Sequence, residues 1–124
     1  MKLSYSKLEK LKSRKAIEQL FVEGETVAAF PLRLVFLKKE HAAKTVLKVG
    51  VSVSKRKVKN AVDRNRIKRL LREAYRLNKA DFGTVNEHQF IGMFLYLDTK
   101  EWSQKELNLK MRKLAVKFLA HTNS

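Results

Sequence analysis

The sequence predicts an α+β fold in which helices pack against one small sheet. In three segments the apolar residues recur at spacings of three and four, which is typical of amphipathic helices. In other segments apolar and polar residues alternate, which is the two-residue period of a half-buried strand. The expected order is α-β-β-α-β-α, within one domain that spans residues 1–124.

The first third of the chain is predicted to form a helix and then a strand. The helix is indicated by its apolar positions, which are Leu8, Leu11, Ala16, Ile17, Leu20 and Phe21. Gly24 is expected to end it. Residues 30–37 then predict a strand, in which Pro31 suits only the first positions or an edge because proline cannot donate to a sheet ladder.

The middle of the chain is predicted to form a second strand followed by a long helix. In residues 45–54 leucine and valine alternate with glycine and polar residues. Asn60 is a suitable helix N-cap, and Asp63 stands three residues later, where a negative charge favours the helix dipole. This helix is expected to run to about residue 79.

The last third is predicted to form a strand over residues 90–97 and a final helix. Ser103 can cap this helix, and Trp102 is expected to anchor it to the core. The apolar residues on its buried face would be Leu107, Met111, Leu114, Ala115 and Phe118.

The chain carries a large excess of positive charge. Its 124 residues include 28 Lys and Arg against 12 Asp and Glu, which gives a net charge of +16. So much like charge on a small fold repels itself, and a polyanionic partner explains it most simply, nucleic acid first and an anionic membrane second. The chain has no cysteine, which excludes disulfides, a thiolate zinc site and a cysteine nucleophile.

Neither secretion nor membrane insertion finds support in the sequence. The N-terminus is polar and lacks the apolar core of a signal peptide. The longest apolar run, residues 93–97, is far shorter than the roughly 20 residues that a membrane span needs. We therefore expect a cytoplasmic protein with no membrane partner.

The positive charge is densest at residues 55–79, where eleven Lys and Arg are opposed only by Asp63 and Glu73. At about 100° per residue, Arg64, Lys68, Arg72 and Arg76 follow one another along one side of the predicted helix. The opposite side collects the apolar residues, which are Ile67, Leu70, Leu71, Ala74 and Leu77. One side would thus face the sheet and the other would present a cationic stripe.

This stripe has two interpretations, a solvated helix face or a phosphate-binding face. Solvated faces normally intersperse acidic residues that form i,i+4 pairs, whereas here Arg64 and Lys68, and then Lys68 and Arg72, repel each other. A helix that holds such repulsion is expected to bind an anion. Phosphate binding would release counterions and therefore depend strongly on salt.

Two stretches carry a family resemblance: KVGVSVSKR at residues 48–56 and NAVDRNRIKRLLREAYR at residues 60–76. They resemble the signature region of the bacterial ribonuclease P protein family, and the Arg64-Asn65-Arg66 core makes the match far more specific than a generic basic run. Residues 11–24 also fit the family's first helix and turn. The resemblance implies an α+β sandwich with a left-handed βαβ crossover, which periodicity alone would not predict.

The resemblance also implies a function. Proteins of this family bind a large catalytic RNA, and the complex removes the 5′ leader from precursor tRNA. The RNA carries the chemistry, so no catalytic residue is expected in this chain. Mg2+ would be held mainly by the RNA and the substrate. The expected partners are the catalytic RNA and the precursor tRNA, and no obligate protein partner is expected.

Two sets of site residues follow from the resemblance. The residues expected to contact RNA are Arg56, Arg64, Asn65, Arg66, Lys68, Arg69, Arg72 and Arg76. Arg66 lies away from the stripe and could instead pair with Glu73 or Asp63.

The second set would line a cleft for the single-stranded leader. Its expected residues are Ile17, Phe21, Val35 or Phe36, Ser52, Ser54 and Lys55. Exposed aromatic side chains stack on bases, and nearby cations follow the backbone. Ile17 stands where the family commonly has an aromatic residue, and Phe21 either stacks on RNA or belongs to the core.

Three other functions fit the sequence less well. A protein nuclease would need Asp63, Glu73, Asp81 and Asp98 to gather around magnesium, and scattered carboxylates are usually surface residues. A ribosomal protein or an RNA chaperone would share the basic composition and lack the long signature. A helix-turn-helix protein would need a helix where residues 47–54 predict a strand.

Overall fold

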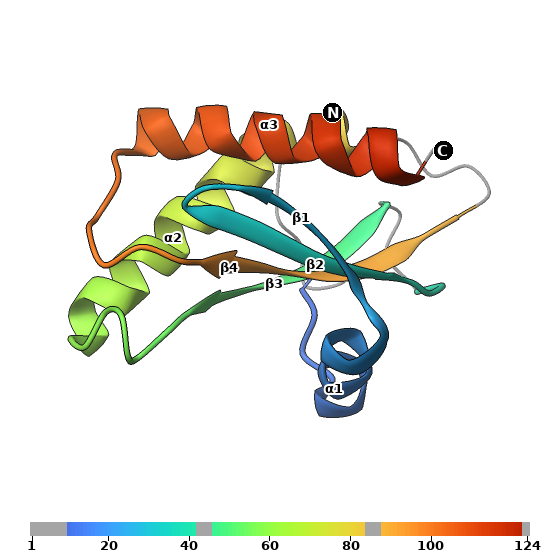
Figure 1. The fold of residues 1–124 in the computed structure, drawn as a ribbon, viewed down its shortest axis with the longest axis horizontal. Helices are drawn as coiled ribbons and strands as arrows, with labels where there is room; N and C mark the ends of the chain where they lie inside the picture. The colour runs from blue at the N-terminus through green and yellow to red at the C-terminus, as the bar shows by residue number, and fades with distance from the viewer. Residues whose placement is uncertain (1–9, 42–45, 84–87, 123–124) are drawn as a thin grey trace.

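A mixed four-stranded sheet organises the computed structural model, which describes residues 10–41, 46–83 and 88–122. The elements in chain order are α1 (Arg14–Glu23), β1 (Glu25–Ala29), β2 (Leu32–Lys38), β3 (Leu47–Val53), α2 (Ala61–Asn78), the 3-10 helix η2 (Lys79–Phe82), β4 (Phe90–Tyr96) and α3 (Gln104–Thr122) (Figure 1). The predicted α+β class is confirmed, and every predicted element is found in the predicted order. One strand, β1, comes in addition.

The added strand explains why the first predicted strand is displaced. β1 is short and only its last residue, Ala29, is buried, so its sequence shows no clear alternation. It pairs with β2 through a tight connection at Phe30 and Pro31, which are joined by a cis peptide bond. These two residues therefore lie in the turn, and the strand expected to begin at residue 30 begins at Leu32.

The strands lie in the order β1-β2-β4-β3. β2 is antiparallel to β1 and β4, whereas β3 is parallel to β4. Because β3 and β4 are parallel neighbours joined through α2, the chain contains a βαβ crossover. The left-handedness of this crossover stays a prediction from the resemblance.

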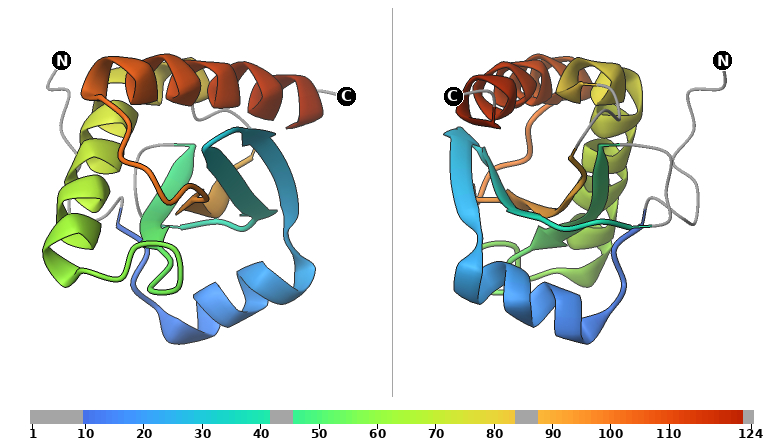
Figure 2. Two further views of the ribbon diagram at one scale, coloured as in Figure 1. Left: turned by 60° about the vertical axis from the view of Figure 1, so that its left-hand side comes forward. Right: turned by 90° about the vertical axis from the view of Figure 1, so that its right-hand side faces the viewer.

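Helices cover both faces of the sheet, because strand side chains alternate between them. On one face Leu34 and Phe94 pack with residues of α2, η2 and α3 to form the larger core. On the other face Val35 and Met93 pack beneath Leu20 of α1 in a smaller core. Figure 2 shows α1 across the sheet from α3.

The predicted helix caps are confirmed. The Asn60 side chain accepts a hydrogen bond from the Val62 amide at 2.9 Å, and Asp63 lies in the first turn of α2. At α3 the Ser103 hydroxyl accepts from the Glu106 amide at 3.1 Å, while the Glu106 carboxylate accepts from the Ser103 amide at 3.2 Å. This reciprocal pair is a capping box.

The first helix begins later than expected. α1 starts at Arg14, after Ser13 has capped it by accepting a hydrogen bond from the Ala16 amide at 3.3 Å. Leu11 is buried, but it lies in an extended segment whose amide donates to the Val49 carbonyl of β3 at 2.9 Å. Leu8 lies outside the described residues.

The long helix α2 is rotated relative to the predicted orientation. Leu77, expected in the core, is 43% exposed, whereas Tyr75 is only 2% exposed. Tyr75 fills the space between Phe82 and Phe94, with ring centroids 5.7 and 5.4 Å away. The prediction that Leu77 lies in the core is therefore wrong, because Tyr75 and its aromatic neighbours fill the core at the end of α2.

Gly24 lies between α1 and β1, where it is packed closely against Leu20 and Val35. A Cβ atom there would overlap the Leu20 carbonyl oxygen and lie 2.9 Å from Val35 Cγ1. Gly24→Ala should therefore lower the free energy of unfolding by about 1–3 kcal/mol, measured by urea denaturation.

Val22→Ala is the matched control, because Val22 lies on the same helix and is exposed. Its effect should stay within about 0.5 kcal/mol. A Gly24→Ala protein as stable as the parent would show that the junction between α1 and β1 can relax without cost.

Candidate nucleic-acid interface

The outward face of α2 is centred on Arg69. The buried residues of this helix are Ile67, Leu71, Ala74 and Tyr75. At about 100° per residue, the side opposite them is occupied by Asn65, Arg69, Arg72, Glu73 and Arg76. Arg64 and Lys68 are half-buried at the edge of this side, so the cationic stripe is turned away from the position that the sequence pattern predicted.

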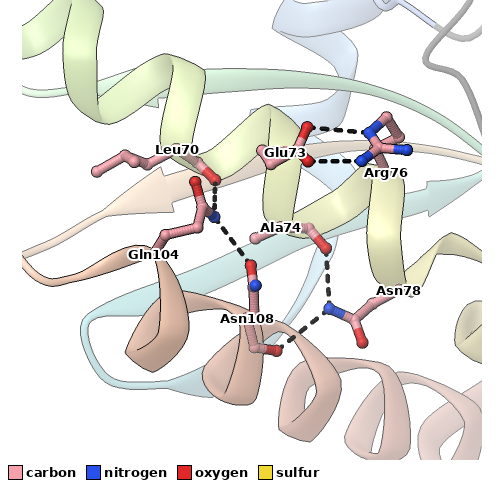
Figure 3. Close-up of polar contacts among 7 residues, drawn as sticks. All are labelled: Leu70, Glu73, Ala74, Arg76, Asn78, Gln104 and Asn108. Carbon is pink, nitrogen blue, oxygen red and sulfur yellow. Dashed lines mark hydrogen bonds and ion pairs between the residues drawn. The ribbon is translucent and has the colours of Figure 1, made fainter.

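Side-chain amides help to fix this orientation of α2 against α3. Gln104 donates to the Leu70 carbonyl at 3.0 Å and to the Asn108 side chain at 2.8 Å (Figure 3). Asn78 donates to the Ala74 carbonyl at 2.9 Å and to the Asn108 carbonyl at 3.2 Å. These bonds satisfy polar groups between the two helices, and rotation of α2 would break them.

Arg64 is engaged by the chain itself. Its Nη1 donates to the carbonyl oxygens of Val58 and Lys59, both at 2.8 Å. The guanidinium thus holds the loop that precedes α2 against the helix. The structure gives Arg64 a structural role, and its contact with RNA stays a prediction.

Two other arginines of the signature are paired with carboxylates. Arg66 pairs with Asp63 and, through Nε at 2.8 Å, with Glu101, so Asp63 and not Glu73 is its partner in the helix. Arg76 binds Glu73 through two hydrogen bonds of 2.9 and 2.5 Å (Figure 3). These bonds from Arg76 lower the pKa of Glu73 and keep it ionised.

Three cations of α2 differ from these. Within the described residues no carboxylate forms an ion pair with Lys68, Arg69 or Arg72. We call these three residues the α2 basic face. Their charges are not neutralised by the fold, which leaves them available to an external anion.

The loop between β3 and α2 adds further cations. Arg56 is exposed, and its amide donates to the Ser54 hydroxyl at 3.1 Å. The loop is anchored by buried Val58, whose amide donates to the Ser54 carbonyl at 2.9 Å. Ser54 and Lys55 are exposed beside Arg56, so two residues expected in the leader cleft adjoin one expected at the catalytic RNA.

A groove of about 510 Å3 lies between α1, β3 and α2, and we call it the α1 groove. Its apolar wall includes Ile17 and Met93, and Arg72 reaches it from α2. The groove thus joins one predicted leader residue to one predicted RNA-binding residue. Lys10 and Lys12 also line it; sequence reasoning missed them, although their position on either side of apolar Leu11 is a signal that could have indicated them.

The other expected leader residues have different positions. Phe21, four residues after Ile17 on α1, is 51% exposed and therefore is not a core residue. Ser52 is half-buried on β3, paired in register with Leu95. Val35 lies on the α1 side of the sheet and is buried beneath that helix.

The alternative prediction that Phe36 lines the leader cleft is wrong. It was an alternative to Val35, but it lies on the opposite face of the sheet and is 1% exposed. Its ring packs against Phe118 at a centroid distance of 5.0 Å. Adjacent strand residues point to opposite faces, so only one of Val35 and Phe36 could lie on the side of α1.

The described residues offer no protein metal centre. No three histidine or acidic side chains among them are grouped as metal ligands, and Asp63 and Glu73 are bound to arginines. Asp98 accepts hydrogen bonds from Trp102 Nε1 and the Thr99 amide. Among the helices that the structure describes, none combines the length and the apolar character needed to cross a membrane.

Comparison with known proteins gives a consistent result. The family model "Ribonuclease P" matches residues 5–118. A ribonuclease P protein component from Porphyromonas gingivalis is 49% identical over 75 residues, which are 60% of this chain and 54% of that protein. One from Chlorobaculum tepidum is 37% identical over 95 residues, covering 68% of this chain and 62% of that protein. The matched part thus spans between half and two thirds of these relatives.

Solved structures share the fold. The ribonuclease P protein of Staphylococcus aureus superimposes with a TM-score of 0.68 at 21% identity, covering 90% of this chain and 95% of the other. That of Thermotoga maritima has a TM-score of 0.62 at 20% identity and covers 90% and 96%. Since the family model matches most of the sequence, the chain belongs to the ribonuclease P protein family.

Proposed function

We propose that this protein is the RNA-binding subunit of ribonuclease P. The α2 basic face would bind the catalytic RNA, and the α1 groove would hold the 5′ leader of precursor tRNA while the RNA carries out cleavage. The observation that carries this proposal is the position of Arg72, which belongs to the α2 basic face and also lines the α1 groove. One continuous cationic surface can therefore contact both RNAs.

The charges of α2 support the contact with the catalytic RNA. Lys68 and Arg72 are four residues apart and repel each other, and no carboxylate of the described chain relieves them. RNA phosphates would offset this repulsion and release counterions. Arg66 and Arg76 would contribute less, because their partners already neutralise them.

The α1 groove has the features that unpaired RNA requires. Ile17 and Met93 provide an apolar wall for bases, and Lys10, Lys12 and Arg72 provide cations for the phosphates between them. Phe21 extends the apolar surface by one turn of α1 and offers an exposed ring for stacking. Ile17 can provide only apolar contact, so we assign stacking to Phe21.

The magnesium of the reaction would be held by the RNA and its substrate. The described residues present no cluster of oxygen or imidazole ligands. The cations of the α1 groove would also repel a divalent ion placed on the protein there. We assign the protein the task of neutralising phosphates, which lets the two RNAs approach each other. We further propose that it acts in the cytoplasm and needs no other protein as a partner.

The experiment that tests this function is cleavage of precursor tRNA at low magnesium. Bacterial ribonuclease P RNA, this protein, or both together are incubated with the substrate. We expect cleavage at the mature 5′ end only with both, because the protein supplies the missing neutralisation. If the protein adds nothing to the RNA, a role as a ribosomal protein or RNA chaperone would be favoured, and cleavage by the protein alone would place the chemistry on the chain.

The α2 basic face predicts a weaker salt dependence in variants without its charges. Arg69→Ala with Arg72→Ala should weaken binding to the catalytic RNA and reduce the slope of log K against log salt by about one for each phosphate that is no longer neutralised. The slope is measured by filter binding over a series of salt concentrations. The control is Lys38→Ala with Lys39→Ala, which removes the same charge from two exposed residues outside α2 and the α1 groove. Equal slopes for both double variants would remove the assignment to α2.

Phe21 predicts a separation of the two binding activities. Phe21→Ala should weaken binding of a precursor tRNA with a leader and leave binding of the catalytic RNA nearly unchanged, because only the leader would stack on this ring. Val22→Ala is the control, since Val22 is the adjacent exposed residue of α1. Affinities are measured for substrates with and without a leader, and equal weakening for both would show that Phe21 does not contact the leader.

A further inference from the structure

A second surface with apolar and cationic side chains lies on α3, and the proposed function does not use it. A groove of about 560 Å3 is lined by Trp102, Leu109 and Val116. Lys110, Arg112 and Lys113 line it as well. We call it the α3 groove. It shares no lining residue with the α1 groove, and α3 lies across the sheet from α1 (Figure 1).

The apolar side chains of this groove are exposed to an unusual degree. Leu109 and Val116 are seven residues apart, so they lie on one face of α3, and they are 56% and 64% exposed. Trp102 is half-buried at one end, and the exposed ring of Phe30 meets it edge-on at a centroid distance of 6.0 Å. Grouped apolar side chains on a surface mark a binding site more often than isolated ones do.

The charges that line the groove are mostly positive, since Lys110, Arg112 and Lys113 are opposed there by the carboxylate of Glu106. Within α3, five Lys and Arg are opposed by the single acidic residue Glu106. That carboxylate already accepts from the Ser103 hydroxyl at 2.9 Å in the capping box. Lys113 and Lys117 are four residues apart and repel each other. Lys117 also donates to the Ala28 carbonyl, whereas no carboxylate of the described residues forms an ion pair with Arg112 or Lys113. The outer face of α3 therefore keeps two cations without an acidic partner.

The combination selects one kind of partner. Flat apolar groups linked by negative charges match an apolar strip between cations, and unpaired RNA has this chemistry. A second copy of the chain would bring one charge of +16 against another, which opposes association. We propose that the α3 groove binds an unpaired stretch of RNA, as a site separate from the α2 basic face and the α1 groove.

The assignment of contacts follows from the geometry. Bases would lie against Leu109 and Val116 and meet the rings of Phe30 and Trp102, while Arg112 and Lys113 bind phosphates. Lys110 Nζ is 5.8 Å from the centre of the Trp102 ring, which places a cation at the end of the strip. Trp102 Nε1 donates to Asp98 at 2.7 Å, and this bond holds the ring in place.

The protein contains its own probe for this site, because Trp102 is its only tryptophan. The full chain is titrated with a short single-stranded oligouridylate while the tryptophan fluorescence is recorded. We expect saturable quenching whose midpoint rises with salt. Arg112→Glu with Lys113→Glu should shift this midpoint upward by about tenfold, and neither substitution touches the contact between Lys110 and the ring. Leu109→Gln, which removes apolar surface without changing charge, should also raise it.

The control is Arg69→Glu with Arg72→Glu, which changes the same number of charges on α2. It should leave the quenching midpoint within about twofold, although it should weaken binding to the catalytic RNA. No quenching, or quenching that the α2 variant abolishes and the α3 variant retains, would overturn the proposal. Quenching by an acidic peptide but not by the oligouridylate would assign the groove to a protein instead. None of these outcomes depends on cleavage, so they leave the proposed subunit function to its own test.

Discussion

The aromatic contact between Tyr75, Phe82 and Phe94 is the interaction on which the arrangement of the α2 basic face depends. Tyr75 belongs to α2 and Phe94 to the central strand β4, so their packing sets the rotation of the helix on the sheet. Gln104 of α3 and Asn78 of α2 reinforce that rotation through hydrogen bonds between the two helices. This packing therefore decides in which direction each cation of α2 points. A surface of long, flexible side chains thus owes its geometry to a rigid aromatic core.

The parallel pairing of β3 and β4 extends this constraint to the α1 groove. It leaves β3 as an edge strand, to which the segment before α1 is attached by the Leu11 amide. Residues from three distant parts of the sequence therefore meet around Arg72. The site is a property of topology, because its lining residues come from residues 10–17, from β3, from α2 and from β4.

Local signals predicted the elements well and their mutual orientation less well. Asn60 and Ser103 are caps whose bonds form within a few residues, so the sequence pattern contains them completely. The rotation of α2 depends on contacts with Phe82 and Phe94, and a helical wheel cannot include these. It therefore placed Leu77 inside and overlooked Tyr75. β1 escaped prediction because most of its side chains are exposed and lack the alternation that marks a half-buried strand.

The acidic residues show how a chain with a net charge of +16 neutralises some of its cations and leaves others without an acidic partner. Asp63 and Glu101 hold Arg66, and Glu73 holds Arg76, so these arginines stiffen α2 and its junction with the segment before α3. Arg64 is bound to backbone carbonyls. Exposed ion pairs of this kind contribute little to stability, about 0–1 kcal/mol each, but they remove charge from chosen positions. On α2, the charge that remains without a carboxylate partner among the described residues is concentrated at Lys68, Arg69 and Arg72, and Arg72 carries it into the α1 groove.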